Sequence, residues 1–429
     1  MATTTTTTAT ASKPALRPLR RNPQFQLLWL GQSTASLGIT VASVAYPLAI
    51  VTVTGSAGQA GLFAAVQTVG TLVAGLPAGH IADRYDRRTV VLVVQLCRAL
   101  VTAVVVAGLI QSWLSLPLLL AAAALLGAGQ AAASAAQLPL VRSVVPPEQL
   151  TTALVQDEVR VNGAALAGPP LAGLLFGVRH AAPFIFTAIT FVAAALAAVA
   201  FRAFSGRQGT GAPTGRPASS GARSSGAGSS GVGGMLAGVR WIWAAPMLRA
   251  ALILCMSVNT VGAGVELIVI VLLHRQHASP GLIGVVLAAA AVGGLAGAPL
   301  VRPLHRIRPG VLLLGACLLD IPLMALLAAP YGPWWLGSLL FTSALIIPSL
   351  RVLIDVLIFR QVPDELRGRT VAALTTLLAA GMPVGLAGTG ILLQWLPART
   401  AVLLLAALEA VGVLCCAARK ELWRAQWPQ

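Results

Sequence analysis

The stretch Gly79-His80-Ile81-Ala82-Asp83-Arg84-Tyr85-Asp86-Arg87-Arg88 decides the fold of this chain. It lies between two long apolar runs, residues 60–78 and 89–110. Five of its last six residues are charged, and hydrocarbon solvates charges poorly, so we predict a tight polar loop between two membrane helices. Three of the five charges are arginines, and an excess of Lys and Arg is typical of loops on the cytoplasmic side.

Each kind of residue in this loop has a use at a helix end. Gly79 allows one helix to approach a neighbour closely, and Asp83 suits the positive N-terminal end of another helix. Arg87 and Arg88 can pair with carboxylates. The order Gly, Asp four residues later, then paired Arg resembles the loop between the second and third helices of the major facilitator superfamily. The resemblance implies an all-α integral membrane fold of twelve transmembrane helices, arranged as two pseudo-symmetric six-helix bundles. It also implies a gating role for Gly79, Asp83, Arg87 and Arg88.

The composition favours a membrane protein. Of the 429 residues, 57% are hydrophobic and 10% are charged, whereas a soluble domain carries roughly 25% charged residues. The net charge of +17 would indicate a nucleic-acid partner if the arginines gathered on one soluble face. They are spread between apolar runs instead, so we expect a lipid bilayer as partner, no nucleic acid, and a multi-pass location in the cell (inner or plasma) membrane.

A span of about 20 apolar residues crosses a bilayer, and the chain offers twelve such candidates. They are residues 25–53, 57–80, 89–110, 115–141, 150–178, 181–203, 248–273, 280–302, 309–329, 333–360, 368–395 and 399–418. When alternate loops are scored, 23 Lys and Arg residues fall on one side and three on the other. This asymmetry would collapse if one span were missed, and it predicts that both termini are cytoplasmic.

The spans divide the chain into five parts. We expect a disordered basic N-terminal tail (1–24), an N-terminal six-helix bundle (25–203), a C-terminal six-helix bundle (248–418) and a cytoplasmic tail (419–429). Residues 204–247 are expected to be a flexible cytoplasmic linker, rich in Gly and Ser, that ends in an interfacial helix containing Trp241 and Trp243. The second half repeats the opening motif in degraded form, with Val301 in place of the Asp, so the gating contact is expected to be one-sided.

Span 5 carries a second resemblance. It reads Ala164-Ala-Leu-Ala-Gly168-Pro169-Pro170-Leu-Ala172-Gly173, where Gly168-Pro169 is predicted to break the helical hydrogen-bond ladder and the small residues to give a thin face. It is similar to the exporter signature of the same superfamily, Gly-x-x-x-Gly-Pro-x-x-Gly-Gly, with Ala164 and Ala172 replacing Gly. The resemblance implies efflux and a gating role for Gly168 and Pro169. The alternative is a generic kinked span.

Polar side chains recur at helical spacing in spans 1, 4, 7 and 10, the four spans that line the central cavity in this superfamily. Ser and Thr at such positions can also simply join helices, so both interpretations stay open. The residues predicted to bind substrate are Gln32, Ser36, Gln130, Gln137, Asn259, Glu266, Arg351 and Asp355.

Carboxylates within spans are costly and usually functional. Glu266 lies in mid-span without a cationic neighbour at helical spacing, which suits a proton carrier. Asp157 and Glu158 are further proton-coupling candidates; the alternative is an ion pair near the cytoplasmic mouth, and Arg98 is a possible partner for either. Asp320 and Glu409 are also in mid-span, but their spans are peripheral in the superfamily.

One departure from the superfamily concerns coupling. Its drug–proton antiporters usually carry an Arg in span 4, and Ala123 stands at that position here, so Glu266 or the Arg351 and Asp355 pair is expected to substitute. We therefore expect a monomeric secondary transporter that exports small amphipathic molecules (a drug, an antibiotic or a siderophore) with protons as coupling ion. No cofactor, metal site or catalytic constellation is expected. The alternatives are an uptake porter, a lysolipid-type carrier, or a non-transporting sensor or scaffold.

Overall fold

The computed structural model describes residues 19–208, 239–244, 246–304, 306–329, 331–362 and 364–417. Most of the expected N-terminal tail, most of the linker and the C-terminal tail therefore lie outside the described residues. Within them, twelve helical segments are long and apolar enough to cross a membrane, as predicted, and the described part is helical with no strand.

The first half consists of six helices after a short 3₁₀ helix, η1 (Leu19–Arg21). Asn22 caps α1 by accepting hydrogen bonds from the backbone N–H groups of Gln24 and Phe25, so order begins before the predicted start of span 1. The helices are α1 (Pro23–Thr54), α2 (Ala57–Arg84), α3 (Arg87–Ile110), α4 (Leu116–Val144), α5 (Leu150–Val178, after the 3₁₀ turn η2, Pro147–Gln149) and α6 (Ala182–Gln208). α6 thus extends into the segment expected to be linker.

The second half begins with a short helical segment, 239–244, whose Ile242 is buried against the C-terminal helices. The remaining elements are α8 (Pro246–Gly262), α9 (Val265–Arg275), α10 (Pro280–Gly297), η3 (Ala298–Leu300), α11 (Val301–Leu304), α12 (Pro309–Leu326), α13 (Pro333–Ala344), α14 (Ile347–Gln361), α15 (Asp364–Trp395) and α16 (Ala398–Ala417).

Spans 7 and 10 are each interrupted, which the sequence analysis did not predict. Span 7 divides into α8 and α9 at Gly262 and Gly264, where two glycines lower helix stability. Span 10 divides into α13 and α14 at Leu345–Ile346, just before Pro348. Pro348 has no N–H to donate to the carbonyl four residues earlier, so the helix is weakened at that turn.

α5 is continuous from Leu150 to Val178 with both prolines inside it, so the backbone donors that Pro169 and Pro170 lack do not end the helix. The thin face is present: Gly168 lies against Thr40 of α1, whose Oγ1 donates to the carbonyl oxygen of Ala164 at 3.0 Å. Neighbouring helices thus support the segment where the prolines remove backbone donors.

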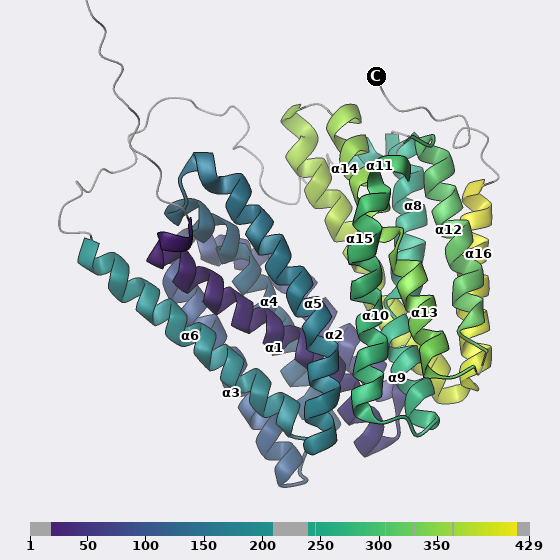
Figure 1. Cartoon of the computed structure of the whole chain (residues 1–429), viewed down its shortest axis with the longest axis horizontal. Coiled ribbons are helices and arrows are strands. Elements are labelled where there is room, and N and C mark those ends of the chain that lie inside the picture. Colours follow the sequence, from purple (N-terminus) through teal and green to yellow (C-terminus); the bar gives the residue numbers. More distant parts are fainter. Residues whose placement is uncertain are drawn as a thin grey trace, which may run out of the picture.

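The two halves meet through two helix pairs, α2 with α15 and α5 with α10. Figure 1 shows these helices between the purple-to-teal first half and the green-to-yellow second half. Glycines allow the close approach: the backbone of Gly284 lies against the Pro169 carbonyl, and that of Gly61 against the Leu386 carbonyl. All these contacts lie near the start of α2 and α10 and the end of α5 and α15, so they join the halves at one end of the molecule.

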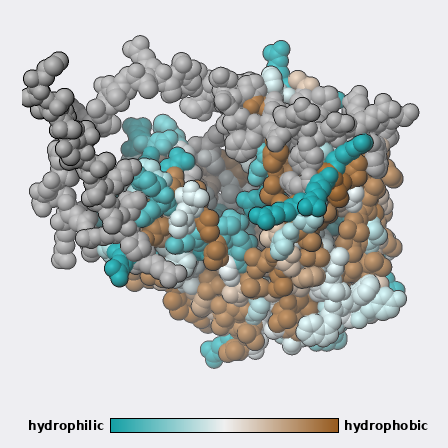
Figure 2. Space-filling model, turned by 45° about the horizontal axis from the view of Figure 1, so that its top comes forward, coloured by the Kyte–Doolittle hydropathy of each residue, from teal (hydrophilic) through white to brown (hydrophobic). Residues whose placement is uncertain are grey.

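The opposite end, which we call the arginine-rich end, carries Arg84, Arg87, Arg88, Arg142, Arg302, Arg306 and Arg308. Towards it the ribbons of the two halves diverge (Figure 1), and an added Cβ at Gly75 or Gly79 on α2 would meet no other atom within 4 Å. In Figure 2, which turns this end towards the viewer, hydrophilic residues gather there and hydrophobic residues dominate the visible flanks. The halves are therefore closed at one end and separated at the arginine-rich end.

The glycine contacts generate a test of this closure. Gly284→Val would place side-chain atoms against the Pro169 carbonyl, and overpacking of this kind costs about 1–3 kcal/mol, so the closed end should open more often. The measurement is the distance between spin labels at Ser112 and Tyr331, in a background in which the exposed Cys97 and Cys415 are replaced by Ser. Gly294→Val on the same helix is the matched control, because nothing lies within 4 Å of its added Cβ. Equal distances in the two variants would contradict this packing.

Candidate functional site

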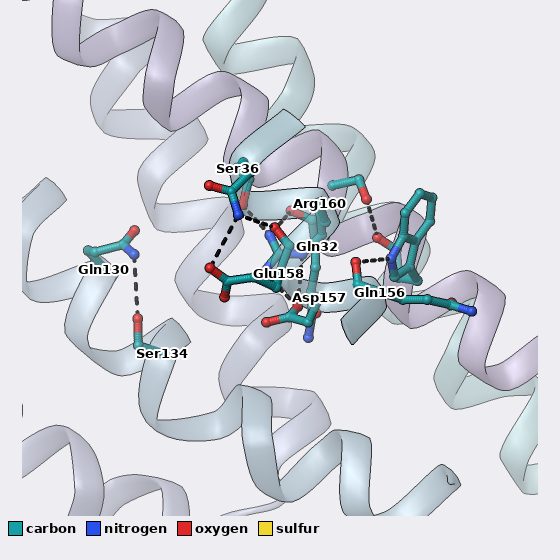
Figure 3. Close-up of polar contacts among 11 residues, drawn as sticks. Gln32, Ser36, Gln130, Ser134, Gln156, Asp157, Glu158 and Arg160 are labelled. Atoms are coloured by element: carbon teal, nitrogen blue, oxygen red, sulfur yellow. Dashed lines mark hydrogen bonds and ion pairs between the residues drawn. The ribbon is translucent and has the colours of Figure 1, made fainter. Parts of the chain in front are cut away.

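Arg160 is the centre of a polar cluster between α1 and α5. Its guanidinium contacts Asp157 Oδ1 at 2.8 Å, donates to the carbonyl oxygen of Gln32 at 3.1 Å, and makes a further short contact with Ser36 Oγ. Figure 3 shows these side chains converging from the two helices. The side chain of Arg160 is buried whereas that of Asp157 is 41% exposed, so the pair fixes α5 to α1 and leaves a carboxylate edge open.

Glu158 reaches the other half of the molecule. Its Oε1 lies 3.8 Å from a guanidinium nitrogen of Arg351 on α14, and Asn162 Nδ2 donates to the same carboxylate at 3.2 Å. Both members of the ion pair are exposed, and such pairs contribute about 0–1 kcal/mol, so this bridge between the halves is easily broken. Asp355, one turn after Arg351, is exposed as well.

The predicted residues of α4 divide between two places. Gln130 Nε2 donates to Ser134 Oγ at 3.4 Å, and Figure 3 shows this pair on the side towards which Glu158 points. Gln137 instead lines a small cavity of about 30 Å³ within the first bundle, together with the side chain of Gln32. The structure therefore does not bring all the predicted substrate ligands to one surface.

Asn259 and Glu266 lie on either side of the break between α8 and α9, and both are exposed. α9 packs on α1 and α2 of the first half as well as on α10, α15 and α16, so it is enclosed by helices. Residues 267–271 are buried, whereas Glu266 at the start of α9 is exposed. Among the described residues, Glu266 forms no ion pair.

The Gly79–Arg88 stretch is mostly helical, because α2 continues to Arg84 and α3 begins at Arg87. Asp86 caps α3 by accepting from the Arg88 N–H and Thr89 Oγ1, and Asp83 pairs with Arg87 at 3.7 Å. The close approach expected at Gly79 is absent here, since the two halves are separated at this end.

The suggested pairing of Arg98 with Asp157 or Glu158 is wrong. Arg98 is buried on α3 and stacks on the Phe191 ring of α6, with its guanidinium carbon 4.2 Å from the ring centroid. The two acids have other partners, Arg160 and Arg351. Nothing in the spacing of the sequence could have shown an arginine–aromatic contact between spans 3 and 6.

The Glu158–Arg351 bridge, the Asp157–Arg160 pair beside it and Asp355 one turn after Arg351 bring three carboxylates and two guanidinium groups towards the gap between the halves. We group the exposed Glu266 with them and call this set of residues the central face. Each arginine already contacts one of the carboxylates. The carboxylates of this face can bind cations. The amide of Gln130 and the hydroxyl of Ser134 on α4 can form hydrogen bonds with polar groups of a ligand. Over the part of the chain that the structure describes, no group of three or more His, Cys, Asp or Glu could hold a metal ion.

Comparisons with known proteins agree with this architecture. The sequence profile of the Major Facilitator Superfamily matches residues 28–386. The chain is 27% identical over 386 residues to the multidrug efflux pump Tap of Mycobacterium tuberculosis, covering 86% of this chain and 87% of that protein.

Solved structures show the same fold. A bacterial homologue of the human lysosomal transporter Spinster, inward-facing and unoccupied, matches with a TM-score of 0.69 and 16% identity over 95% of this chain and 97% of that one. A bacterial homologue of the iron transporter ferroportin matches with a TM-score of 0.67 in its inward-facing state (18% identity, 94% of this chain and 100% of that one). The match to its outward-facing state has a TM-score of 0.55 (19% identity, 92% and 97%).

The Arg160 cluster generates a stability prediction. Arg160→Met would leave the Asp157 carboxylate without its cation and Ser36 without its contact, and we expect a loss of about 1–2 kcal/mol because Asp157 is partly solvated. Arg179→Met, an exposed arginine at the far end of α5, is the control and should change little. The measurement is the Tm of the purified protein in detergent. Equal Tm values for the two variants would contradict a stabilising role for Arg160.

Proposed function

The chain belongs to the major facilitator superfamily of transporters, and on that premise we propose that it exports small amphipathic cations in exchange for protons. It does so as a monomer in the cell membrane, with both termini in the cytoplasm. The two halves rock about a midplane site, as is common for transporters built from two parallel repeats. Substrate enters from the arginine-rich end in the state described here.

The excess of carboxylates on the central face carries the proposal. After Arg160 and Arg351 are matched with Asp157 and Glu158, the carboxylates of Glu266 and Asp355 remain. Unmatched carboxylates within a membrane protein are costly, and a bound cation or a proton relieves that cost. The same two groups therefore suit substrates with a positive charge, and Gln130, Ser134 and Asn259 add hydrogen-bonding groups on the same face.

Three observations support the direction of transport. The loops of the open end carry most of the arginines, which favours the cytoplasmic side for that end. The similarity to the ferroportin homologue is greater for its inward-facing than for its outward-facing state. The relative from Mycobacterium tuberculosis is a multidrug efflux pump, and it matches across 86% of this chain.

Exchange with protons follows from competition at Glu266. A cation arriving from the cytoplasm displaces the proton from neutral Glu266, which is released to the cytoplasm, and the cation binds the resulting carboxylate. When the halves rock and the site opens to the outside, a proton arriving there neutralises Glu266 and releases the cation. Neutral Glu266 then allows the empty site to return, because moving an unpaired charge through the closed state is costly.

The gating residues act when the arginine-rich end closes. α2 and α15 pack side by side in opposite directions, so the end of α2 that carries Gly79 and Asp83 faces the start of α15 at Asp364. Closing would set the Asp83 carboxylate at the N-terminus of α15, where a negative charge is favoured by about 0.3–1 kcal/mol. Gly168 and Pro169 stay in the packed contact with α1 and α10 and act as the pivot between the halves.

The experiment uses the purified protein in vesicles, with ethidium as an amphipathic cationic probe. Ethidium should accumulate against its gradient when the compartment on the far side from the arginine-rich end is acidic, and should only equilibrate without a pH gradient. Ethidium flux that ignores the gradient would contradict proton coupling. Accumulation in the opposite direction would identify an uptake porter, and no flux for any cationic probe would favour a sensor or scaffold.

Glu266 gives the sharpest variant. Glu266→Gln keeps the size and polarity of the side chain but cannot exchange a proton, so pH-driven accumulation of ethidium should fall to the level of empty vesicles. Glu148→Gln, an exposed carboxyl in η2 at the arginine-rich end, is the matched control and should transport as the unchanged protein does. If Glu266→Gln retains full accumulation, the assignment of Glu266 is wrong.

A further inference from the structure

A second group of acids lies in the C-terminal half, away from the residues of the central face. Glu409 of α16 is 1% exposed, and Asp320 of α12 is half-buried beside it. Ser343 of α13 donates a hydrogen bond from its Oγ to Asp320 Oδ1 at 2.5 Å. α12, α13 and α16 carry none of the residues assigned to the substrate, and they bring two carboxyl groups and a hydroxyl together.

Asp320 and Glu409 lie where α12 packs on α16, close enough for the charge of one carboxyl group to act on the other. Two ionised carboxylates can only accept hydrogen bonds and they repel each other, so a proton shared between them is favoured. Oε1 of Glu409 is buried and has no hydrogen-bond partner among the described residues. The pair thus has a buried acceptor that no protein donor satisfies.

No counter-ion takes the place of that proton. The three ion pairs in the described part of the chain lie elsewhere, at Asp83–Arg87, Asp157–Arg160 and Glu158–Arg351. The titratable neighbours are thiols: Cys317 lies one turn before Asp320, and Cys255 of α8 and Cys416 of α16 pack in the same cluster. α13 has no charged residue, and α15 has none between 370 and 395.

The charged groups that the structure describes on the remaining neighbours lie at other places. Arg249 of α8 donates to the carbonyl oxygen of Trp243. α14 presents Arg351, which pairs with Glu158, and Asp355, which is exposed. α9 presents Glu266 at the central face, and His274 and Arg275 at the end where the halves are closed. Two adjacent carboxylates without a cation repel strongly in a medium of low polarity, so at least one of them must hold a proton.

We propose that Asp320 and Glu409 form a second proton-binding site, which binds a further proton at a place where the substrate does not bind and shifts the balance between the open and closed states. The proposal deepens the proton exchange described above and rests on it. The step is a simple binding of one proton between two carboxylate oxygens. No bond other than O–H forms or breaks, and no co-reactant is needed.

The position of Ser343 connects this site to the gap between the halves. Ser343 lies in the last turn of α13, two residues before the break at Leu345–Ile346. Beyond the break, α14 carries Arg351, which forms the weak bridge to Glu158 of the first half. Loss of the shared proton would leave two carboxylates that repel each other, so Asp320 and Glu409 would separate. The Ser343 hydroxyl binds an ionised Asp320 more strongly, so α13 would move with Asp320, and the interruption allows α14 to follow.

The equivalent position in the first half holds an arginine in place of the acid pair. Arg98 is the twelfth residue of α3, as Asp320 is of α12, and these are the third helices of the two bundles. Arg98 stacks on Phe191 of α6, whereas Asp320 meets Glu409 of α16, and α6 and α16 are the sixth helices. Equivalent helix pairs therefore bury an arginine in one half and an acid pair in the other. A guanidinium group keeps its proton, whereas a pair of carboxyl groups can take up and release one.

The test measures conformation without substrate. Spin labels at Tyr85 and Arg306 report the separation of the halves at the arginine-rich end, in the background lacking Cys97 and Cys415. In the unchanged protein, the ratio of open to closed states should change about tenfold between about pH 5.5 and pH 8.5, as expected for a coupling of ordinary size. Glu409→Gln cannot release a proton, so the ratio should change less than about twofold over the same range.

Glu148→Gln, the exposed carboxyl in η2, is the matched control and should retain the pH response, because it lies outside both proton sites. Asp320→Asn is the second variant and should also lose the response if Glu409→Gln does not fold. An infrared band of a protonated carboxyl, lost in Glu409→Gln and kept in Glu266→Gln, would identify the proton directly. A response that is unchanged in Glu409→Gln and Asp320→Asn would overturn the proposal.

This test is independent of the proposed function, because it uses neither substrate nor a pH gradient. If the protein does not accumulate ethidium but its pH response is present and is lost in Glu409→Gln, the second proton site is supported and the proposed transport is contradicted. If the protein accumulates ethidium under a pH gradient and Glu409→Gln keeps the full pH response of the open-to-closed ratio, proton-coupled transport is supported and the second proton site is contradicted.

Discussion

The structure depends on the inability of hydrocarbon to solvate an unpaired charge. Twelve apolar segments can lie in the bilayer because nearly all the arginines are in loops, and the arginines left within spans are each stabilised by a neighbouring side chain. Arg98 stacks on an aromatic ring, Arg160 is neutralised by Asp157, and Glu158 meets Arg351 across the gap. The carboxylates without such a solution are those to which we assign transport: Glu266 and Asp355 at the central face, and the Asp320–Glu409 pair.

Much of the fold follows from the sequence, because a span is a local property. Apolar length and punctuation by Pro, Gly and charge placed α5 at its observed ends, and most other ends within a few residues. The interruptions of spans 7 and 10 were not predicted. A proline inside a helix weakens it, but neighbouring helices decide whether it breaks: α5 is supported by α1 and α10 around Pro169, whereas α13 ends before Pro348. That support depends on tertiary packing, which a single sequence does not contain.

The candidate site could be predicted only in part. Helical spacing identified polar stripes in four spans, and the exposed Asn259, Glu266, Arg351 and Asp355 agree with a central face. Pairings between spans depend on the rotation of each helix about its axis. Glu158 and Arg351 are far apart in the sequence, as are Asp320 and Glu409, and no local pattern links either pair. The same rotation turns the Gln137 side chain into the first bundle, although its spacing matches that of Gln130.

The central claim is that protons and an amphipathic cation move in opposite directions through one molecule. Coupling between two ligands is reciprocal, so a gradient of the cation alone must be able to move protons. The most direct measurement follows internal pH in vesicles that contain the protein and a pH-sensitive dye, after ethidium is added on one side with no pH gradient. The account predicts that protons leave the compartment that ethidium enters, and that Glu266→Gln abolishes this movement. Ethidium entry without proton movement, or with protons moving in the same direction, would contradict it.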